Sequence, residues 1–172
     1  MSKELFADPD KCTGCNRCSY VCSATKTGAF APSASRIKIN NYPHRGYSVP
    51  SICFHCPGAA CQKACPSGAI SRSEQNVVTV DAALCTACGS CMAACPYGMI
   101  EVPAGGTACK CDYCSGDPAC VKECYAKALA FAEKTPELIR LKGVQMKQRS
   151  SEGQPETKRN NLGNALVALA RD

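Results

Sequence analysis

Cysteine is the residue type whose number and spacing could do chemistry in this chain of 172 residues. All but one of the 17 cysteines fall into four runs of four. The runs are Cys12, Cys15, Cys18 and Cys22; Cys53, Cys56, Cys61 and Cys65; Cys85, Cys88, Cys91 and Cys95; and Cys111, Cys114, Cys120 and Cys124. The first and third runs read C-x2-C-x2-C-x3-C, a spacing typical of ligands to [4Fe-4S] clusters. The runs therefore predict four [4Fe-4S] clusters and one-electron chemistry.

The fourth cysteine of each run is expected to serve a different cluster from the first three. Three thiolates on a tight loop converge on one cube, whereas the fourth is expected at a helix start that points away. Proline follows Cys65 and Cys95, and it suits the first turn of a helix or a sharp bend. We therefore expect the motifs to work in pairs, with short helices after Cys22, Cys65, Cys95 and Cys124.

A disulfide scaffold and zinc binding are the two other uses of so much cysteine. The first nine residues contain no apolar stretch of the kind found in a secretory signal, which argues against disulfides. C-x2-C pairs are shared by zinc and iron–sulfur sites, but the triplet followed by x3-C-P is not a zinc pattern. The longest apolar run, Ala165 to Ala170, is too short to span a membrane, so we expect a cytoplasmic protein.

Composition and charge agree with a small protein that its clusters help to stabilise. Tryptophan is absent and aromatic residues make up only 6% of the chain, which predicts a thin apolar core. The formal net charge is +6. Each oxidised cluster with its four thiolates carries about −2, which brings the loaded protein to roughly −2. The basic composition is therefore weak support for nucleic acid, and no basic patch interleaved with aromatic residues is present.

The chain divides into a cysteine-rich part, residues 1–132, and a cysteine-free tail, residues 133–172. Short apolar segments that resemble strands recur in the first part. They are Gly68 to Ile70, Val77 to Val80, Gly98 to Val102 and Ala128 to Phe131. Arg36 to Asn40 alternates like a further strand, and Val77 to Val80 reads as the return strand of a hairpin. The repeat predicts an α+β fold of β-loop-α units.

The tail is predicted to contain two helices joined by a linker. Thr135 and Pro136 form a typical helix start, and the polar stretch from Ser150 to Asn160 is interpreted as the linker. The second helix, Asn161 to Ala170, has an apolar face made of Leu162, Ala165, Leu166 and Leu169. We interpret this helix as a strap onto another subunit or another copy of the complex, because so short a helix is unstable alone. Packing on the chain's own core is the alternative.

Four segments resemble the four-cluster electron-transfer subunits of bacterial molybdenum and tungsten oxidoreductases. The segments are Val49 to Cys56, Ala64 to Ile70, Cys85 to Gly98, and Cys111 to Cys114 with Pro118 to Cys120. That family includes the iron–sulfur subunits of formate dehydrogenase, dimethyl-sulfoxide reductase and polysulfide reductase. The resemblance covers residues 9 to about 131. It implies two interlocked ferredoxin-like halves with pseudo-twofold symmetry, one from the first and fourth motifs and one from the second and third, plus a C-terminal helical extension.

The same resemblance implies four sets of cluster ligands, which exchange their fourth cysteines. The sets are set A, Cys12, Cys15, Cys18 and Cys124; set B, Cys111, Cys114, Cys120 and Cys22; set C, Cys53, Cys56, Cys61 and Cys95; and set D, Cys85, Cys88, Cys91 and Cys65. Ser23 and Tyr125 stand where the ferredoxin pattern has proline. We therefore expect looser or displaced helix starts in the half that holds sets A and B.

The compact chain looks most like the small subunit that accompanies tungsten-pterin aldehyde oxidoreductases, with a flavin subunit as third member. This likeness implies a non-catalytic wire between a tungsten- or molybdenum-pterin subunit and a flavin-containing partner. A free-standing polyferredoxin carrier is the alternative, as is a subunit of a benzoyl-CoA reductase, formate dehydrogenase or hydrogenase complex. The sequence itself has no dinucleotide fingerprint and no P-loop.

Several residues beside the ligands have more than one interpretation. Cys109 would compete with Cys111 for the same iron, so we predict instead that it packs as a small apolar residue. His55 could tune a potential or carry a proton, but we predict a solvated side chain or one that donates a single hydrogen bond. His44 is predicted to lie in a surface turn. Basic residues inside the ligand runs either raise a cluster potential or offset the thiolates: Arg17, Lys63, Lys110 and Lys122. No residue is predicted to be a general acid, a general base or a nucleophile.

Overall fold

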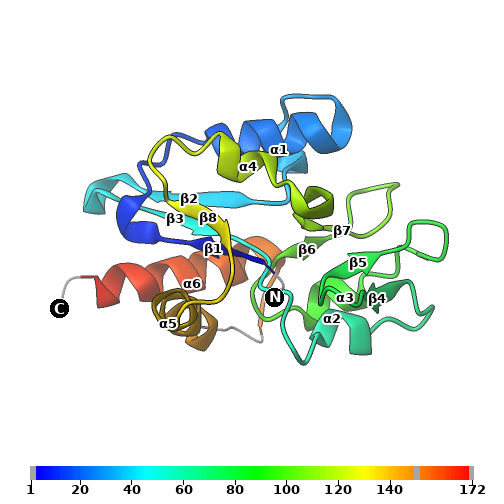
Figure 1. The fold of residues 1–172 in the computed structure, drawn as a ribbon. Helices are drawn as coiled ribbons and strands as arrows, with labels where there is room; N and C mark the ends of the chain where they lie inside the picture. The colour runs from blue at the N-terminus through cyan, green and yellow to red at the C-terminus, as the bar shows by residue number, and fades with distance from the viewer. Residues whose placement is uncertain (1–2, 149–151, 171–172) are drawn as a thin grey trace.

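The strands of the protein form four antiparallel pairs in the computed structural model, which describes residues 3–148 and 152–170. The strands are β1 (Glu4–Ala7), β2 (Lys38–Tyr42), β3 (Tyr47–Ser51), β4 (Ile70–Arg72), β5 (Val78–Val80), β6 (Ile100–Glu101), β7 (Cys109–Lys110) and β8 (Leu129–Ala132). The pairs are β1 with β8, β2 with β3, β4 with β5 and β6 with β7 (Figure 1). Strands β1 and β8 join the two ends of the cysteine-rich part, with Leu5 opposite Phe131.

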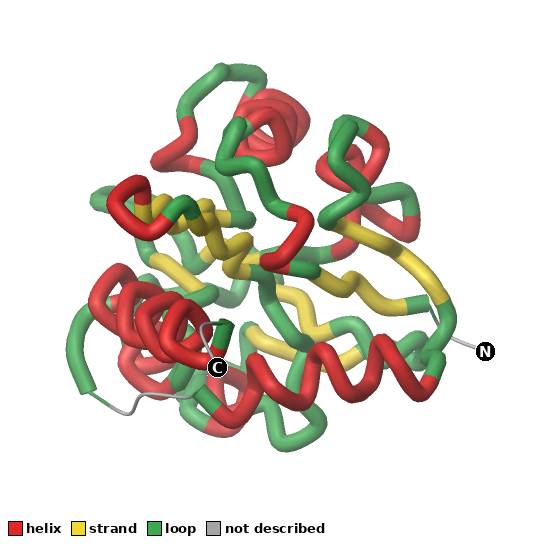
Figure 2. The backbone as a smooth tube through the Cα atoms, turned by 90° about the vertical axis from the view of Figure 1, so that its left-hand side faces the viewer, coloured by secondary structure: helices red, strands yellow, loops and turns green. Residues whose placement is uncertain are grey.

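The helices lie on both sides of these strands. They are α1 (Arg17–Thr27), α2 (Ala60–Lys63), α3 (Ser90–Ala94), α4 (Ala119–Lys122), α5 (Pro136–Lys147) and α6 (Pro155–Leu169). Helix α1 packs against α4, and α2 packs against α3. Helices α5 and α6 lie on the opposite side of β1 and β8 from α1 and α4 (Figures 1 and 2). Within the described ranges, no helix has the length and apolar character needed to cross a membrane.

The predicted mixture of strands and helices is confirmed. Strands β4, β5, β6 and β8 each overlap one of the segments that the sequence marks as strand-like, and β4 and β5 form the predicted hairpin with Ile70 opposite Val80. The helix pairs bring the first motif against the fourth and the second against the third. This is the contact that two interlocked halves require, while their pseudo-twofold symmetry stays a prediction.

The motif helices lie before the fourth cysteine, and not after it as we predicted. Helices α2, α3 and α4 end just before Cys65, Cys95 and Cys124. Cys95 has an extended backbone with ψ of 115°, because a following proline disfavours the helical conformation. Helix α1 instead runs through Cys22, which no proline follows. At Cys22 the structure thus shows a longer helix, and not the looser or displaced start that we expected. Helix α4 still ends before Cys124, although Tyr125 stands in the place of proline there.

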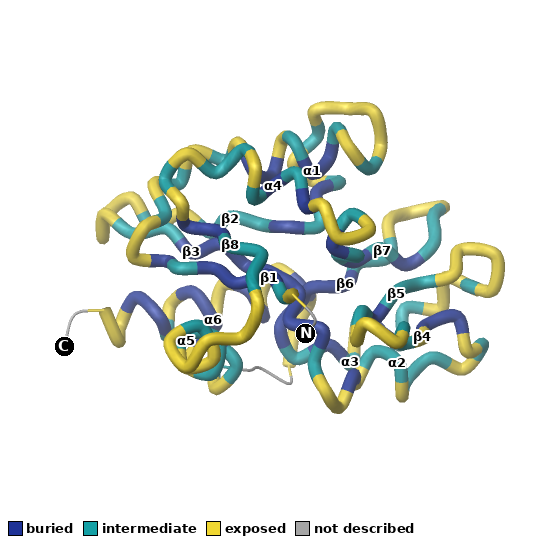
Figure 3. Tube along the Cα trace, viewed as in Figure 1, coloured by how far each residue is buried: buried dark blue, intermediate teal, exposed yellow. Residues whose placement is uncertain are grey.

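The apolar core includes the sulfur atoms of the motifs. Leu5 of β1, Val49 of β3 and Ile100 of β6 are buried, and Figure 3 colours parts of these strands as buried. Six motif cysteines are buried in the same cluster of side chains: Cys18, Cys22, Cys53, Cys91, Cys95 and Cys120. Since so many core positions carry thiols, the groups that bind these thiols must contribute to the stability of the fold.

The tail begins as predicted and then departs from the prediction. The Thr135 hydroxyl accepts a hydrogen bond from the Leu138 N–H at 3.2 Å, and Pro136 is the first residue of α5. Helix α6 begins at Pro155, within the stretch that we interpreted as a linker. Residues 150–151 of that stretch lie outside the described residues. The linker prediction is therefore wrong from Pro155 onward.

Helix α6 packs on this chain. Leu162 and Leu166 are buried, whereas Leu169 remains 51% exposed. Gly163 allows a close approach to β2, because a Cβ there would lie 2.1 Å from the Tyr42 hydroxyl oxygen. The face that we expected to reach another subunit is therefore covered by the chain's own core. Docking by the rest of the tail stays a prediction.

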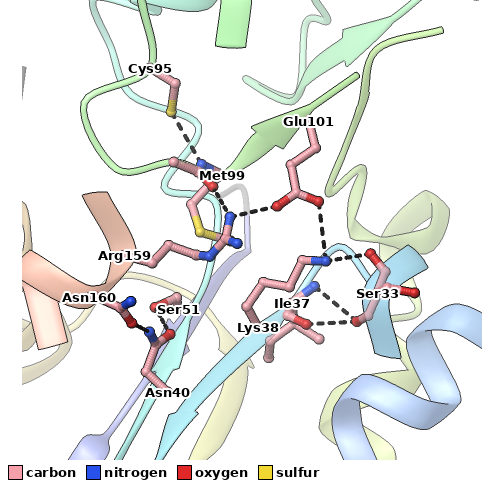
Figure 4. A network of polar contacts seen from close by, with 12 residues as sticks. Ser33, Ile37, Lys38, Asn40, Ser51, Cys95, Met99, Glu101, Arg159 and Asn160 are labelled. Carbon is pink, nitrogen blue, oxygen red and sulfur yellow. Dashed lines mark hydrogen bonds and ion pairs between the residues drawn. The ribbon is translucent and has the colours of Figure 1, made fainter. Parts of the chain in front are cut away.

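Polar contacts also hold α6 on the rest of the chain. The Arg159 guanidinium donates to the Gly98 carbonyl at 2.6 Å and pairs with Glu101 at 2.7 Å (Figure 4). Glu101 also pairs with Lys38 of β2 at 3.2 Å. Helix α6 thus ties β2 to β6, which lies just beyond the third motif.

Candidate metal centres

The structure brings the motif cysteines together from distant parts of the chain. Three groups of four motif cysteines line cavities, and each of these groups combines cysteines from two motifs. The first cavity is lined by Cys22, Cys111, Cys114 and Cys120; the second by Cys53, Cys56, Cys61 and Cys95; and the third by Cys65, Cys85, Cys88 and Cys91. These groups have the membership of sets B, C and D. Ligation of clusters by them stays a prediction.

The thiols of set A also lie near one another. The pKa of Cys18 is raised to about 12, by burial first and then by nearby Cys12, Cys124 and Cys15. Cys124 reaches this group because α4 packs against α1 and β8 pairs with β1. The antiparallel pairing of the chain's ends therefore places the last motif cysteine beside the first motif.

Burial raises the pKa of several of these thiols and so favours their protonated form in the absence of a metal. It raises the pKa of Cys56 and Cys61 to about 11 and that of Cys111 to about 12. Hydrogen bonds shared with the Ser67 and Ser90 hydroxyls instead lower the pKa of Cys65 and Cys88 in set D. Because iron binds thiolates, loading of the buried sets must release protons.

The donor set suits a cube of irons better than a single ion. Sulfurs bound to one zinc ion lie roughly 4 Å apart, because each Zn–S bond is about 2.3 Å long. In the described ranges, no three His, Cys, Asp or Glu side chains come close enough to hold one metal ion. Four cysteine thiols around one cavity are the donor set that a [4Fe-4S] cluster takes. The residues present therefore fit [4Fe-4S] clusters.

Shared elements and linings make neighbours of sets A and B, of sets B and C, and of sets C and D. Set A and set B share α1, where Cys18 and Cys22 lie about one helical turn apart. Cys53 of set C also lines the cavity of set B, beside Cys111. Sets C and D share the second and third motifs, so the order is A, B, C and D. The two exposed motif cysteines are Cys15 in set A and Cys88 in set D.

Backbone N–H groups point at three of the sulfurs. The N–H groups of Arg36, Met99 and Ala108 donate to the sulfurs of Cys22, Cys95 and Cys85, each at 3.4 Å. Such hydrogen bonds strengthen when the sulfur becomes an anion. They favour bound thiolate and belong to the surroundings that tune a metal centre.

His55 differs from the prediction. The side chain is buried, and its Nδ1 accepts a hydrogen bond from the Val78 N–H at 2.9 Å. The ring proton therefore lies on Nε2, which has no hydrogen-bond partner. The pKa of His55 is lowered to about 2, and burial is the largest cause. The predicted solvated or singly donating histidine is wrong, because the ring is enclosed beside set C. His44 lies in an exposed turn, as predicted.

Cys109 lies on β7, opposite Glu101 of β6. The cavity that it lines contains no second cysteine among the described residues, and it includes Arg36, Lys38 and Arg159. Burial raises the pKa of the Cys109 thiol. Its position is separate from the four sets, and its role as a packed, non-ligating residue stays a prediction.

Sequence reasoning missed two basic residues at the sets, Arg72 and Lys158, and it named Lys110 without predicting its burial. Arg72 was not singled out, and Lys158 was placed in a linker. Arg72 follows an ordinary strand pattern, and Lys158 stands in a polar stretch. Helical periodicity extended back from Leu162 to Lys158 was the one signal that could have placed this lysine on the buried face of α6.

Comparisons with known proteins agree with the geometry. A model of the 4Fe-4S dicluster domain matches residues 45–134. The polyferredoxin-like subunit of an aliphatic sulfonate oxidoreductase from Pyrococcus furiosus is 42% identical over 124 residues, which are 70% of each chain. A tetrathionate reductase subunit from Archaeoglobus fulgidus is 38% identical over 112 residues, 63% of this chain and 53% of that one.

A solved structure of the BamBC active-site complex of benzoyl coenzyme A reductase contains a chain of similar extent. The likeness covers 84% of this chain and 89% of that one, with 24% identity and a TM-score of 0.45. The family assignment depends instead on the matched domain and on the Pyrococcus relative. From the cysteine groups, the matched domain and the identity to that relative, we conclude that the chain belongs to the 4Fe-4S dicluster domain family.

Proposed function

We propose that the chain is the electron-transfer subunit of an oxidoreductase complex, and that sets A, B, C and D each hold one [4Fe-4S] cluster. Bound clusters of this type supply one-electron redox chemistry. The observation that carries the proposal is the succession of neighbouring sets from A to D, with an exposed cysteine in set A and another in set D. A row of redox sites that reaches the surface at both ends can connect two partners.

The residues of this chain hold and space these sites. Helix α1 fixes Cys18 and Cys22 about one turn apart, and this spacing keeps sets A and B adjacent. Buried Cys53 and Cys120 lie in the middle of the row, where the surrounding core excludes water. Neighbouring sets in a buried environment favour electron transfer from set to set over loss of electrons to solvent.

The proposed partners are a tungsten- or molybdenum-pterin catalytic subunit of the aldehyde oxidoreductase type and a flavin-containing subunit. The sulfonate oxidoreductase and tetrathionate reductase relatives are both named as subunits of oxidoreductases, which supports a complex. The tungsten enzyme and the flavin partner rest on the sequence resemblance, as does a cytoplasmic location. Contact with further copies of the chain is part of the same proposal.

A free-standing carrier is the second candidate. A tail that docks onto another subunit would speak against a free-standing carrier, because a diffusing carrier needs no such strap. Since Leu162 and Leu166 of α6 are covered by this chain, that argument is weaker. Anaerobic copurification from the native source separates the two candidates. A stable catalytic partner containing tungsten or molybdenum supports the complex, and a monomer in every fraction supports the carrier.

Metal content tests the cluster assignment directly. Anaerobically purified protein should contain about 16 irons and about 16 acid-labile sulfides per chain, with absorbance near 400 nm. A plateau near 12 irons would show that one set is vacant. Zinc in place of iron would contradict the proposal as a whole.

A further inference from the structure

Three basic side chains surround set C without a carboxylate partner. They are Arg72 of β4, Lys110 of β7 and Lys158 of α6. Lys110 lines the cavity of set C itself. Every ion pair found in the described part of the chain involves other basic residues.

The two lysines are enclosed by backbone carbonyls. Lys110 is 4% exposed, and its ammonium donates to the carbonyls of Val78 and, at 3.0 Å, Cys111. Lys158 is 1% exposed, and its ammonium donates to the carbonyls of Ala93 at 2.7 Å and Cys95 at 3.0 Å. Cys95 belongs to set C. Carbonyl dipoles satisfy the N–H groups of both lysines but do not neutralise their charge.

Arg72 is held by the loop that carries another ligand of set C. Its guanidinium donates to the carbonyls of Cys56, His55 at 3.4 Å and Pro57 at 3.4 Å. A further contact joins it to the Asn76 carbonyl at 3.1 Å. The loop of the second motif therefore wraps around a positive charge.

The other sets have a different charge balance. Beside set B, Lys26 and Arg36 both pair with Asp112, at 2.8 and 3.1 Å. Beside set A, Arg17 pairs with Glu123 at 2.8 Å. No charged side chain in the described ranges lines the cavity of set D.

Lys110 also contacts the carbonyl of Cys111 in set B. The ligand carbonyls that Arg72 and Lys158 contact belong instead to set C. The excess of positive charge is therefore largest at set C.

His55 adds a hydrogen-bond donor at the same place. Its Nε2–H has no partner, the side chain is buried, and the ring lines the cavity of set C. A donor of this kind is costly to bury unless an acceptor faces it. Thiolate and sulfide sulfurs at set C would be that acceptor.

We propose that Arg72, Lys110 and Lys158 make the cluster held by set C the most easily reduced of the four. This inference depends on the proposed function, since it needs clusters in all four sets. Reduction changes a four-thiolate cluster from a charge of about −2 to about −3, so nearby cations stabilise the reduced form more than the oxidised form. Burial weakens the screening of the Lys110 and Lys158 charges by water and salt, and Arg72 is partly buried. Burial of lysines without carboxylates also requires a counter-charge, which the cluster provides.

Set D is the competing candidate for the highest potential. The hydroxyls of Ser67 and Ser90 lie at its sulfurs, at 3.6 and 3.4 Å, and its cysteines are more exposed. Hydrogen bonds and exposure to solvent both raise a cluster potential. A hydroxyl carries only a dipole, whereas three full charges act on set C at longer range. The charges should therefore outweigh the hydroxyl contacts.

A reductive titration of the holo-protein followed by electron paramagnetic resonance tests the proposal. Dithionite supplies one electron per cluster, and the signals are assigned by their loss or change in Cys56→Ser for set C and Cys88→Ser for set D. The first signal to develop should respond to Cys56→Ser and not to Cys88→Ser. In Lys110→Met and in Arg72→Gln, the equilibrium constant for reduction at set C should fall at least about tenfold, a shift of about 59 mV for one electron.

Matched variants separate charge from structure. Lys110→Arg keeps the charge and should restore most of the shift. Lys122→Met removes an exposed lysine paired with Asp117, and it should leave the potential of set C unchanged. Iron content is measured for every variant, and if Lys110→Met loses iron, Arg72→Gln decides the question. A first-reduced signal that belongs to set D, or no shift in a fully loaded variant, overturns the inference. Wild-type protein without four clusters would instead contradict the proposed function.

Discussion

Cys22 provides the sharpest test at the scale of single residues. It belongs to the first motif in sequence, but its sulfur lines a cavity with Cys111, Cys114 and Cys120. Cys22→Ala should therefore lower the iron content from about 16 to about 12 by emptying set B. Cys15→Ala is the matched control and should empty set A. Resonance signals of the remaining clusters, compared between the two variants, reveal which set is lost. Loss of the same signal in both variants would contradict the exchange of fourth cysteines.

Cys109 gives a complementary test, because it is the cysteine that lies outside the four sets. Cys109→Ser should leave the iron content unchanged, while Cys111→Ser should lower it by about four irons. Burial raises the pKa of the Cys109 thiol. The thiol should therefore react slowly with alkylating agents at neutral pH and faster as the pH rises toward its pKa. A loss of iron in Cys109→Ser would make it a ligand and remove Cys111 from set B.

At the scale of elements, the packing of helix α6 on the chain can be tested by its effect on stability. Leu166 is buried against the chain, whereas Leu169 of the same helix is 51% exposed. Leu166→Ala should lower the free energy of unfolding by about 2–5 kcal/mol, because it leaves a cavity in the core. Leu169→Ala should change it by less than about 0.5 kcal/mol. Anaerobic urea denaturation of both variants measures the difference. Equal stabilities, with weaker assembly in Leu166→Ala, would restore the interpretation of α6 as a strap.

The elements also show how much of the fold can be predicted from the sequence. Alternation of apolar and polar residues located β2, and short apolar segments located β4, β5, β6 and β8, because both patterns depend on local burial. Helices α2, α3 and α4 were placed on the wrong side of the fourth cysteine, since these short helices follow the ligand loop and carry no apolar periodicity. The cysteine spacing predicted groups of four thiols. The burial of Lys158 escaped prediction, because it depends on α6 folding back onto the third motif.

Iron removal is the test at the scale of the whole molecule. The core contains few large apolar side chains, and six buried cysteines occupy core positions. A chelator applied under oxidising conditions should therefore abolish most of the far-ultraviolet circular dichroism together with the absorbance near 400 nm. A protein kept in anaerobic buffer for the same time is the control. Retention of the dichroism after complete loss of iron would show that the apolar core is sufficient.

The pairing of β1 with β8 has a consequence for biosynthesis. Set A joins Cys12 to Cys124, and set B joins Cys22 to Cys120, so neither set is complete until the fourth motif has left the ribosome. Sets C and D are complete once Cys95 has emerged. Because chains fold from the N-terminus during synthesis, the inner half can receive its iron first. The cysteines of the first motif are synthesised first and remain longest without the other ligands of their sets. Delayed synthesis or oxygen should therefore damage the first motif more than the others.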